Sequence, residues 1–173
     1  MYKVKGKPWA YSGAIDVSDC ATAKEVMLKA GLNFNVAKCE LVGKMPIKLT
    51  GTDEELDRII KEQKEGAHVF GTDIYRKCDN AFATYRTDCN IPLGVVKSKY
   101  TIVQNNDAFN FFDDAIGKNS AIWQTAGFWG NGERIFVSAK LPNNILVKGD
   151  PVENYLVFTN THDGSGGVKI LFT

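Results

Sequence analysis

The feature most able to do chemistry is a predicted β-hairpin whose outer face would carry tryptophans and cations. Asn131-Gly132 lies between two alternating apolar segments, 121–129 and 133–141, and tolerates the positive φ of a type I′ turn. A two-residue turn sets the register, so Gly130 pairs with Glu133 and successive side chains alternate between the two faces. The core face then carries Ile122, Gln124, Ala126, Phe128, Ile135, Val137, Ala139 and Leu141, and the outer face carries Trp123, Thr125, Gly127, Trp129, Arg134, Phe136, Ser138 and Lys140.

A second predicted hairpin repeats this combination of rings and cations. Asp79-Asn80 separates alternating runs at 68–78 and 81–89, which a two-residue turn would pair antiparallel. Exposed rings can stack on unpaired bases, at about 1–3 kcal/mol per base, while cations neutralise phosphates. The sequence therefore predicts a surface for single-stranded nucleic acid made of Trp123, Trp129, Arg134 and Lys140, with Tyr75, Lys77, Phe82 and Arg86 as secondary contacts.

Two other interpretations of these hairpins stay open. The same ring and cation pairs could serve only to stabilise the hairpins through cross-strand and cation–π contacts, or helices could cover the face. Exposed tryptophan and arginine are also typical of protein interfaces, so the chain could act on a host or phage protein instead.

A polar stretch rich in glycine, 161–167, is the second candidate site. His162 could act as a base oriented by Asp163, with Ser165 as the nucleophile. Adjacent residues on a strand point to opposite sides, however, and catalytic triads converge from separate segments. A turn that offers backbone amides to an anion is favoured, so we assign His162, Asp163, Gly164 and Ser165 to a ligand or anion loop and predict no catalytic residue.

Metal and cofactor chemistry has little support in the sequence. The four cysteines, at positions 20, 39, 78 and 89, form no C-x-x-C pair, and the chain has only 2 histidines, so we predict free thiols and no metal. Phosphate-binding signatures rich in glycine are absent, so no nucleotide cofactor is predicted. A binding protein is favoured over an enzyme, and an uncharacterised enzyme that uses His162 is kept as the third alternative.

Composition indicates one domain that spans residues 1–173. The hydrophobic content of 44% is sufficient for one substantial core. Because 21 Lys and Arg balance 20 Asp and Glu, only a local patch could attract a nucleic acid. No signal peptide begins the chain and no run approaches about 20 apolar residues, so we expect a cytoplasmic protein without a membrane partner.

The elements expected from local signals are three helices and several hairpin strands. The capping-box spacing of Thr22 and Glu25 predicts a helix at 22–30, and Thr52 followed by acidic residues predicts a second helix that ends at Gly66. A third helix is predicted from Asn106 to Gly117, and later strands at 155–159 and 168–172. Residues 43–51, with Pro46, are the best candidate for a flexible joint. The expected fold is α+β, a largely antiparallel sheet built from hairpins with about three packed helices.

Three stretches of the sequence are similar to those of a known family. They are 93–105, which contains Leu93-Gly94 and Gln104-Asn105; 125–134, which contains Gly132-Glu133-Arg134; and Asn160 to Ser165. They resemble the phage/plasmid-like family of unknown function that is carried by prophages and plasmids. Lys7-Pro8-Trp9 and 30–34 resemble the opening of the family more weakly. The resemblance implies a mobile-element protein in the host cytoplasm, transfers no catalytic residue, and leaves oligomer formation open. It also implies a further C-terminal strand, and hence a truncated chain or a short relative.

Overall fold

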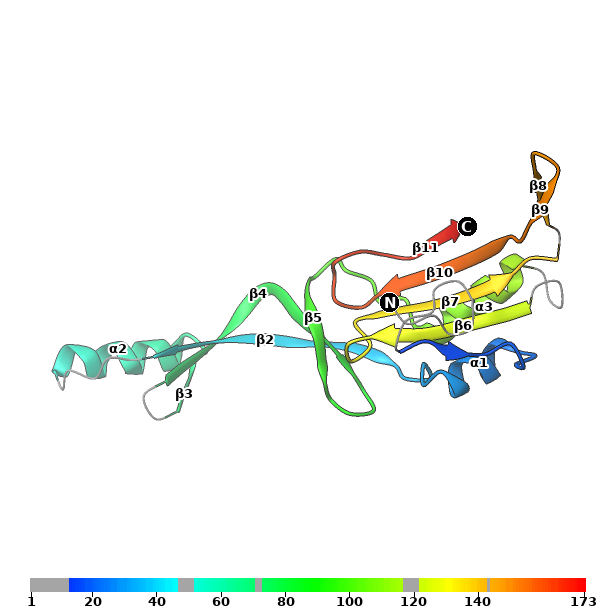
Figure 1. The fold of residues 1–173 in the computed structure, drawn as a ribbon. Helices are drawn as coiled ribbons and strands as arrows, with labels where there is room; N and C mark the ends of the chain where they lie inside the picture. The colour runs from blue at the N-terminus through cyan, green and yellow to red at the C-terminus, as the bar shows by residue number, and fades with distance from the viewer. Residues whose placement is uncertain (1–12, 47–51, 71–72, 117–121, 143) are drawn as a thin grey trace.

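The computed structural model describes residues 13–46, 52–70, 73–116, 122–142 and 144–173. Within these residues the protein has an α+β fold with largely antiparallel sheets, which confirms the predicted fold class. Figure 1 shows a body, which contains one sheet and two helices, and a long arm, which carries the remaining helix at its far end. Trp9 and residues 47–51 of the predicted joint lie outside the described residues.

The body is built on a five-stranded antiparallel sheet with the order β1-β6-β7-β10-β11. The predicted antiparallel pairing of 121–129 with 133–141 is confirmed, and β10 then adds to β7 and β11 to β10. The strands are β1 (Ile15–Asp16), β6 (Ile122–Trp129), β7 (Arg134–Lys140), β10 (Tyr155–Thr161) and β11 (Lys169–Phe172). A small two-stranded sheet, β8 (Ile145–Val147) and β9 (Asp150–Val152), follows β7.

Two helices, α1 (Ala23–Lys29) and α3 (Asn105–Ile116), supply the apolar side chains that cover one face of this sheet. As predicted, Thr22 caps α1 by accepting a hydrogen bond from the Glu25 amide at 3.2 Å. The rings of Phe109 and Phe112 lie 6.3 and 5.7 Å from that of Phe158 on β10. Burying each ring contributes about 1.5–3 kcal/mol, so these contacts hold the helices on the sheet.

The arm is a second antiparallel sheet in which β4 (Asp73–Arg86) pairs with three strands. Its partners are β2 (Val36–Pro46), β3 (His68–Phe70) and β5 (Pro92–Lys97). Helix α2 (Asp53–Lys64) stands at the far end of this sheet (Figure 1). The long strand β2 was missed from the sequence, and it occupies the start of the predicted joint at 43–46.

The predicted hairpin at Asp79-Asn80 is wrong. Strand β4 passes through both residues without turning, and the two predicted arms pair with β2 instead of with each other. Asn80 does adopt the positive φ that was expected, 58°, but it does so where the pairing of β2 with β4 shifts register. An Asp-Asn dipeptide suits a bulge as well as a turn, and only the presence of β2 decides between them.

Candidate functional site

The register predicted from the Asn131-Gly132 turn holds near the turn and fails further along the hairpin. The strands pair as predicted from the turn as far as Thr125, which lies opposite Ser138. Beyond this point the register shifts by one residue, so that Trp123 lies opposite Ala139 and not opposite Lys140. This shift turns Trp123 into the core, where it is 3% exposed and its ring lies 5.8 Å from that of Phe112. The predicted exposure of Trp123 is therefore wrong, because one extra residue in a strand reverses the faces beyond it.

Most of the predicted outer face is buried as well. Thr125, Phe136 and Ser138 are fully buried, and the Thr125 and Ser138 hydroxyls lie 2.7 Å apart. Lys140 remains on this face but forms an ion pair with Glu153 at the other end of β7 from Arg134. Solvent therefore reaches the predicted set mainly at the turn, where Trp129 is 38% exposed and the Arg134 side chain 56% exposed.

A cavity of about 250 Å³ opens beside these two side chains, and we call it the Trp129–Arg134 cleft. Strands β6, β7, β10 and β11 and the turn between the last two strands all contribute to it. An adjoining hollow of about 260 Å³ shares Trp129 and Arg134 and adds Gly130 and Glu133. The cleft is lined by Trp129, Arg134, Thr159, Asn160, Thr161, Ser165, Gly166, Gly167 and Lys169.

The side chains of Trp129 and Arg134 are each held in position by contacts with neighbouring residues. The indole packs on the buried ring of Phe136, with 5.0 Å between ring centroids. The Arg134 guanidinium donates to Ser165 Oγ at 3.2 Å, and its Nε lies 3.7 Å from Asp163 Oδ2. An exposed ion pair of this length contributes less than about 1 kcal/mol, so Arg134 keeps most of its capacity to bind another anion.

The turn at 163–167 is shaped by hydrogen bonds within it and by close packing on β5. Asp163 Oδ1 accepts a hydrogen bond from the Ser165 amide at 2.8 Å. Burial alone would raise the pKa of Asp163, but hydrogen bonds from the Ser165 hydroxyl and amide and the charge of Arg134 outweigh it, so that the pKa is lowered. A Cβ on Gly94 would lie 2.5 Å from Asp163 Cα, so β5 requires glycine there. Gly167 also lines the cleft, and a Cβ there would meet nothing within 4 Å.

The side chain of His162 lies inside the body and does not line the cleft. It is fully buried, and its Nε2 lies 2.8 Å from Asn105 Oδ1. The Asn105 amide nitrogen already donates to Leu32 O at 2.9 Å, so Oδ1 must accept and Nε2 must carry the proton. Burial lowers the pKa of His162 to about 4, only partly opposed by Asp163, which keeps the ring neutral and away from solvent.

The secondary contacts do not join the cleft. Lys77 forms an ion pair with Glu40 on the arm, where Tyr75 also lies, and the Phe82 ring has the Lys38 ammonium 5.5 Å from its centroid. All four residues lie along the single strand β4, so Tyr75 and Lys77 do not pair with Phe82 and Arg86 across a hairpin.

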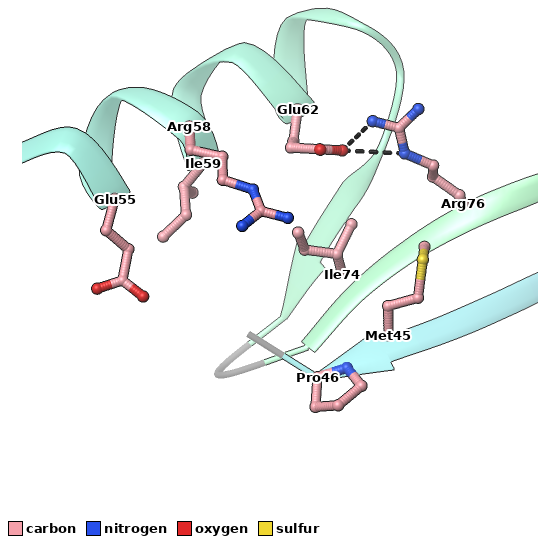
Figure 2. Close-up of a pocket in the computed structure, with 8 residues that line it drawn as sticks. All are labelled: Met45, Pro46, Glu55, Arg58, Ile59, Glu62, Ile74 and Arg76. Carbon is pink, nitrogen blue, oxygen red and sulfur yellow. Dashed lines mark hydrogen bonds and ion pairs between the residues drawn. The ribbon is translucent and has the colours of Figure 1, made fainter. Parts of the chain in front are cut away.

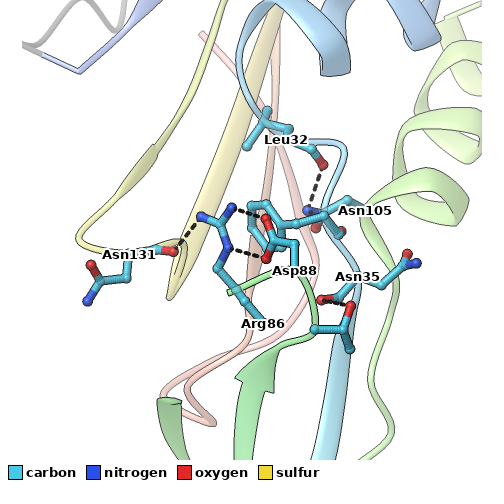
Figure 3. A network of polar contacts seen from close by, with 8 residues as sticks. Leu32, Asn35, Arg86, Asp88, Asn105 and Asn131 are labelled. Atoms are coloured by element: carbon cyan, nitrogen blue, oxygen red, sulfur yellow. Dashed lines mark hydrogen bonds and ion pairs between the residues drawn. The ribbon is translucent and has the colours of Figure 1, made fainter. Parts of the chain in front are cut away.

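Arg86 has a structural role at the base of the 130–133 loop (Figure 3). It forms an ion pair with Asp88 at 2.7 Å and donates to the Asn131 carbonyl at 2.9 Å. Its guanidinium also lies 4.0 Å from the centroid of the Phe34 ring. The hydrogen bond from Arg86 lowers the pKa of Asp88 to about 2. Arg86 thus joins the arm to the loop that presents Trp129 and Arg134.

The three stretches noted in the sequence come together at this end of the body. Tyr100 donates its hydroxyl to the Thr161 carbonyl at 2.7 Å, and Thr84 donates to the His162 carbonyl at 2.6 Å. Together with the contacts of Gly94, Asn105 and Arg134, these bonds fasten 160–165 from three directions. Many residues of the three stretches that resemble the phage/plasmid-like family therefore hold the cleft in place and do not line it.

Besides two glycines, sequence reasoning missed four residues that line the cleft, Thr159, Asn160, Thr161 and Lys169. Thr159 pairs directly with Lys169 across β10 and β11. Thr161 Oγ1 is buried and has no hydrogen-bond partner among the described residues. The sequence did contain a signal for these residues. The glycine-rich loop 163–167 lies between two predicted strands, 155–159 and 168–172, and a hairpin there brings the strand ends that carry the missed residues together.

No helix among the described residues is long and apolar enough to cross a membrane. Cys20, Cys39, Cys78 and Cys89 are all free thiols. No curated protein and no solved structure matches the chain significantly. Residues 92–173, which run from β5 to β11 and include the whole cleft, match the family model of a domain of unknown function, DUF932.

Proposed function

We propose that this chain binds single-stranded nucleic acid, with the Trp129–Arg134 cleft as the contact site. The observation that carries the proposal is the side-by-side placement of a partly exposed indole and a partly exposed guanidinium at the mouth of a cavity. Single-strand sites combine stacking rings with cations that follow the backbone, and both are present here.

Each part of the cleft has a role in this proposal. Trp129 stacks on a base, and its support by Phe136 limits the conformational entropy lost on binding. Arg134 and Lys169 bind phosphates from the two sides of the cleft, while Gly166 and Gly167 allow the strand to approach their backbone. Lys140 and the residues of the arm, Tyr75 and Lys77, play no part at this site.

Affinity and its salt dependence follow from the small number of cations. The net charge of +1 provides no general attraction for a polyanion. Two phosphate contacts on a single strand predict a slope of log K against log salt of about −1.4. Binding is therefore expected to be detectable at low salt and modest at physiological salt.

Fluorescence anisotropy with a labelled oligothymidine at low salt tests the proposal. Trp129→Ala should weaken binding about 5- to 150-fold, the loss of one stacked base. Arg134→Ala should weaken it and make the salt slope less steep by about 0.7. Lys24→Ala is the matched control, because it removes one exposed positive charge from α1, on the opposite face of the sheet.

Two results would contradict the proposal. One is the absence of any binding by the unaltered chain at low salt; the other is an equal effect of Lys24→Ala and Arg134→Ala. A protein partner is the second candidate, because exposed tryptophan and arginine are typical of interface hot spots. A partner that stays bound after nuclease treatment and is released by Trp129→Ala would favour that candidate.

We further propose that the protein acts in phage or plasmid biology in the host cytoplasm. The resemblance of 93–105, 125–134 and 160–165 to phage/plasmid-like proteins supports this setting. Single-stranded DNA arises wherever such elements replicate or transfer, which makes it the preferred ligand. Competition between unlabelled DNA and RNA oligonucleotides of one sequence tests the preference, and stronger competition by RNA would reject it.

A further inference from the structure

Helix α2 at the end of the arm is amphipathic, yet none of its side chains is buried. Leu56 and Ile60, one helical turn apart, are 58% and 41% exposed. A helix of 12 residues is marginal in water unless an apolar face packs against something. The burial that stabilises α2 must therefore come largely from outside the described part of the chain.

The side of α2 that faces its own sheet is a different one. Figure 2 shows Glu55, Arg58, Ile59 and Glu62 pointing from the helix towards the strands, where they line a cavity of about 350 Å³. Glu62 accepts a hydrogen bond from Arg76 Nε at 2.9 Å, and Glu65 lies 3.5 Å from the same guanidinium. Polar contacts near its C-terminal end thus hold α2 on the arm.

Charge is divided along the helix. The first half carries four acidic residues and one cation, Arg58, and the second half carries Lys61 and Lys64 against one acidic residue, Glu62. Because Arg76 pairs with Glu62 and also with Glu65 just after the helix, the second half presents net positive charge to solvent. Two such helices laid antiparallel place acidic halves against basic halves.

We propose that two copies of this chain associate through antiparallel α2 helices. Leu56 of each copy packs against Ile60 of the other around a two-fold axis, an isologous contact. Asp53 and Lys64 are eleven residues apart, about three turns, so they lie on one side of the helix beside Ile60. In the antiparallel pair, Asp53 of each copy faces Lys64 of the other.

A second copy is the partner that this surface fits best, because it is self-complementary in charge. The arm also carries α2 away from the body, so two bodies can lie at opposite ends of the pair (Figure 1). A helix of 12 residues is only about 18 Å long, which gives an interface below the size of stable complexes. Association is therefore expected to be weak and concentration-dependent.

Sedimentation velocity from about 1 µM to about 1 mM tests the proposal, a range that covers weak dimers. The unaltered chain should shift from monomer to dimer across this range. Asp53→Lys or Lys64→Asp alone should raise the dimer dissociation constant roughly tenfold, since each reversal puts like charges at both ends of the pair. Leu56→Ala should have a similar effect, and Lys24→Asp on α1 should have none.

Mixing the two charge variants gives the sharpest result. A pair of one Asp53→Lys chain and one Lys64→Asp chain restores opposite charges at both contacts, so an equimolar mixture should dimerise better than either variant alone. Circular dichroism of each variant confirms that the fold is retained. A chain that stays monomeric at every concentration, or a mixture no better than its components, would overturn the antiparallel pairing.

Discussion

Acidification should destabilise this protein through His162, the histidine buried beside Asn105. Burial lowers the pKa of His162 to about 4, whereas an unfolded histidine has a pKa of 6.5. Between these values the unfolded chain binds a proton that the native protein does not, so the free energy of unfolding falls as the pH falls. Above pH 6.5 both states carry a neutral ring, and stability is independent of this group.

The size of the effect follows from the difference in pKa. Each unit corresponds to 1.36 kcal/mol, so a difference of about 2.5 units removes roughly 3 kcal/mol between pH 6.5 and 4. That is a large part of the 5–15 kcal/mol that stabilises a typical domain. The loss should begin below pH 6.5 and be nearly complete at pH 4.

Urea unfolding followed by tryptophan fluorescence at several pH values measures this loss. His162→Gln retains an amide that can donate to Asn105 Oδ1 and does not titrate, so the variant should lose roughly 3 kcal/mol less than the unaltered chain on going from pH 7 to 4. The loss of the ring contact with Phe34 should lower its stability by a constant amount at every pH.

His68 offers a matched control, because it is exposed on β3 and is the other histidine of the chain. His68→Gln is the reference for replacing a histidine by glutamine, and the effect assigned to His162 is the difference between the two variants. If His162→Gln loses as much stability on acidification as the unaltered chain, the assignment of a buried neutral imidazole is refuted.

Two further predictions concern the support of the cleft. Gly94→Ala should lower the free energy of unfolding by about 1–3 kcal/mol, because the new Cβ meets the Asp163 backbone. Gly167→Ala should change the free energy of unfolding by less than about 0.5 kcal/mol, because its Cβ meets nothing. Calorimetric Tm values test both. Arg86→Met should lower the free energy of unfolding by about 0.5–1.5 kcal/mol, because it removes the hydrogen bond to the Asn131 carbonyl and the pair with Asp88. An unchanged Tm would exclude the structural role of Arg86.

Local sequence signals predicted the helices well. The spacing of Thr22 and Glu25 predicted the start of α1, and Thr52 followed by acidic residues predicted that of α2. A residue within a helix bonds to neighbours three or four positions away, so its pattern is complete within a short window. The Asn131-Gly132 turn was likewise sufficient for the register up to Thr125.

The failures occur where strands from distant parts of the chain meet. The shift beside Trp123 and the passage of β4 through Asn80 both depend on what lies across the strand, which a local pattern does not contain. The face of the body sheet that was predicted to be exposed is largely buried, as at Phe136. The alternation of apolar and polar residues along the strands does not indicate this burial. The prediction of one domain over 1–173 and that of a further C-terminal strand stay predictions.

By itself, the sequence determined the residue types of the candidate site and their local frames: an indole and a guanidinium flanking one turn, and a second turn rich in glycine. Only the tertiary structure brought Arg134 to Ser165, added Lys169, and withdrew Trp123 and His162 from solvent. The reason is physical. Local hydrogen bonds decide the conformation of a turn, whereas exposure depends on the sum of contacts from segments that are remote along the chain.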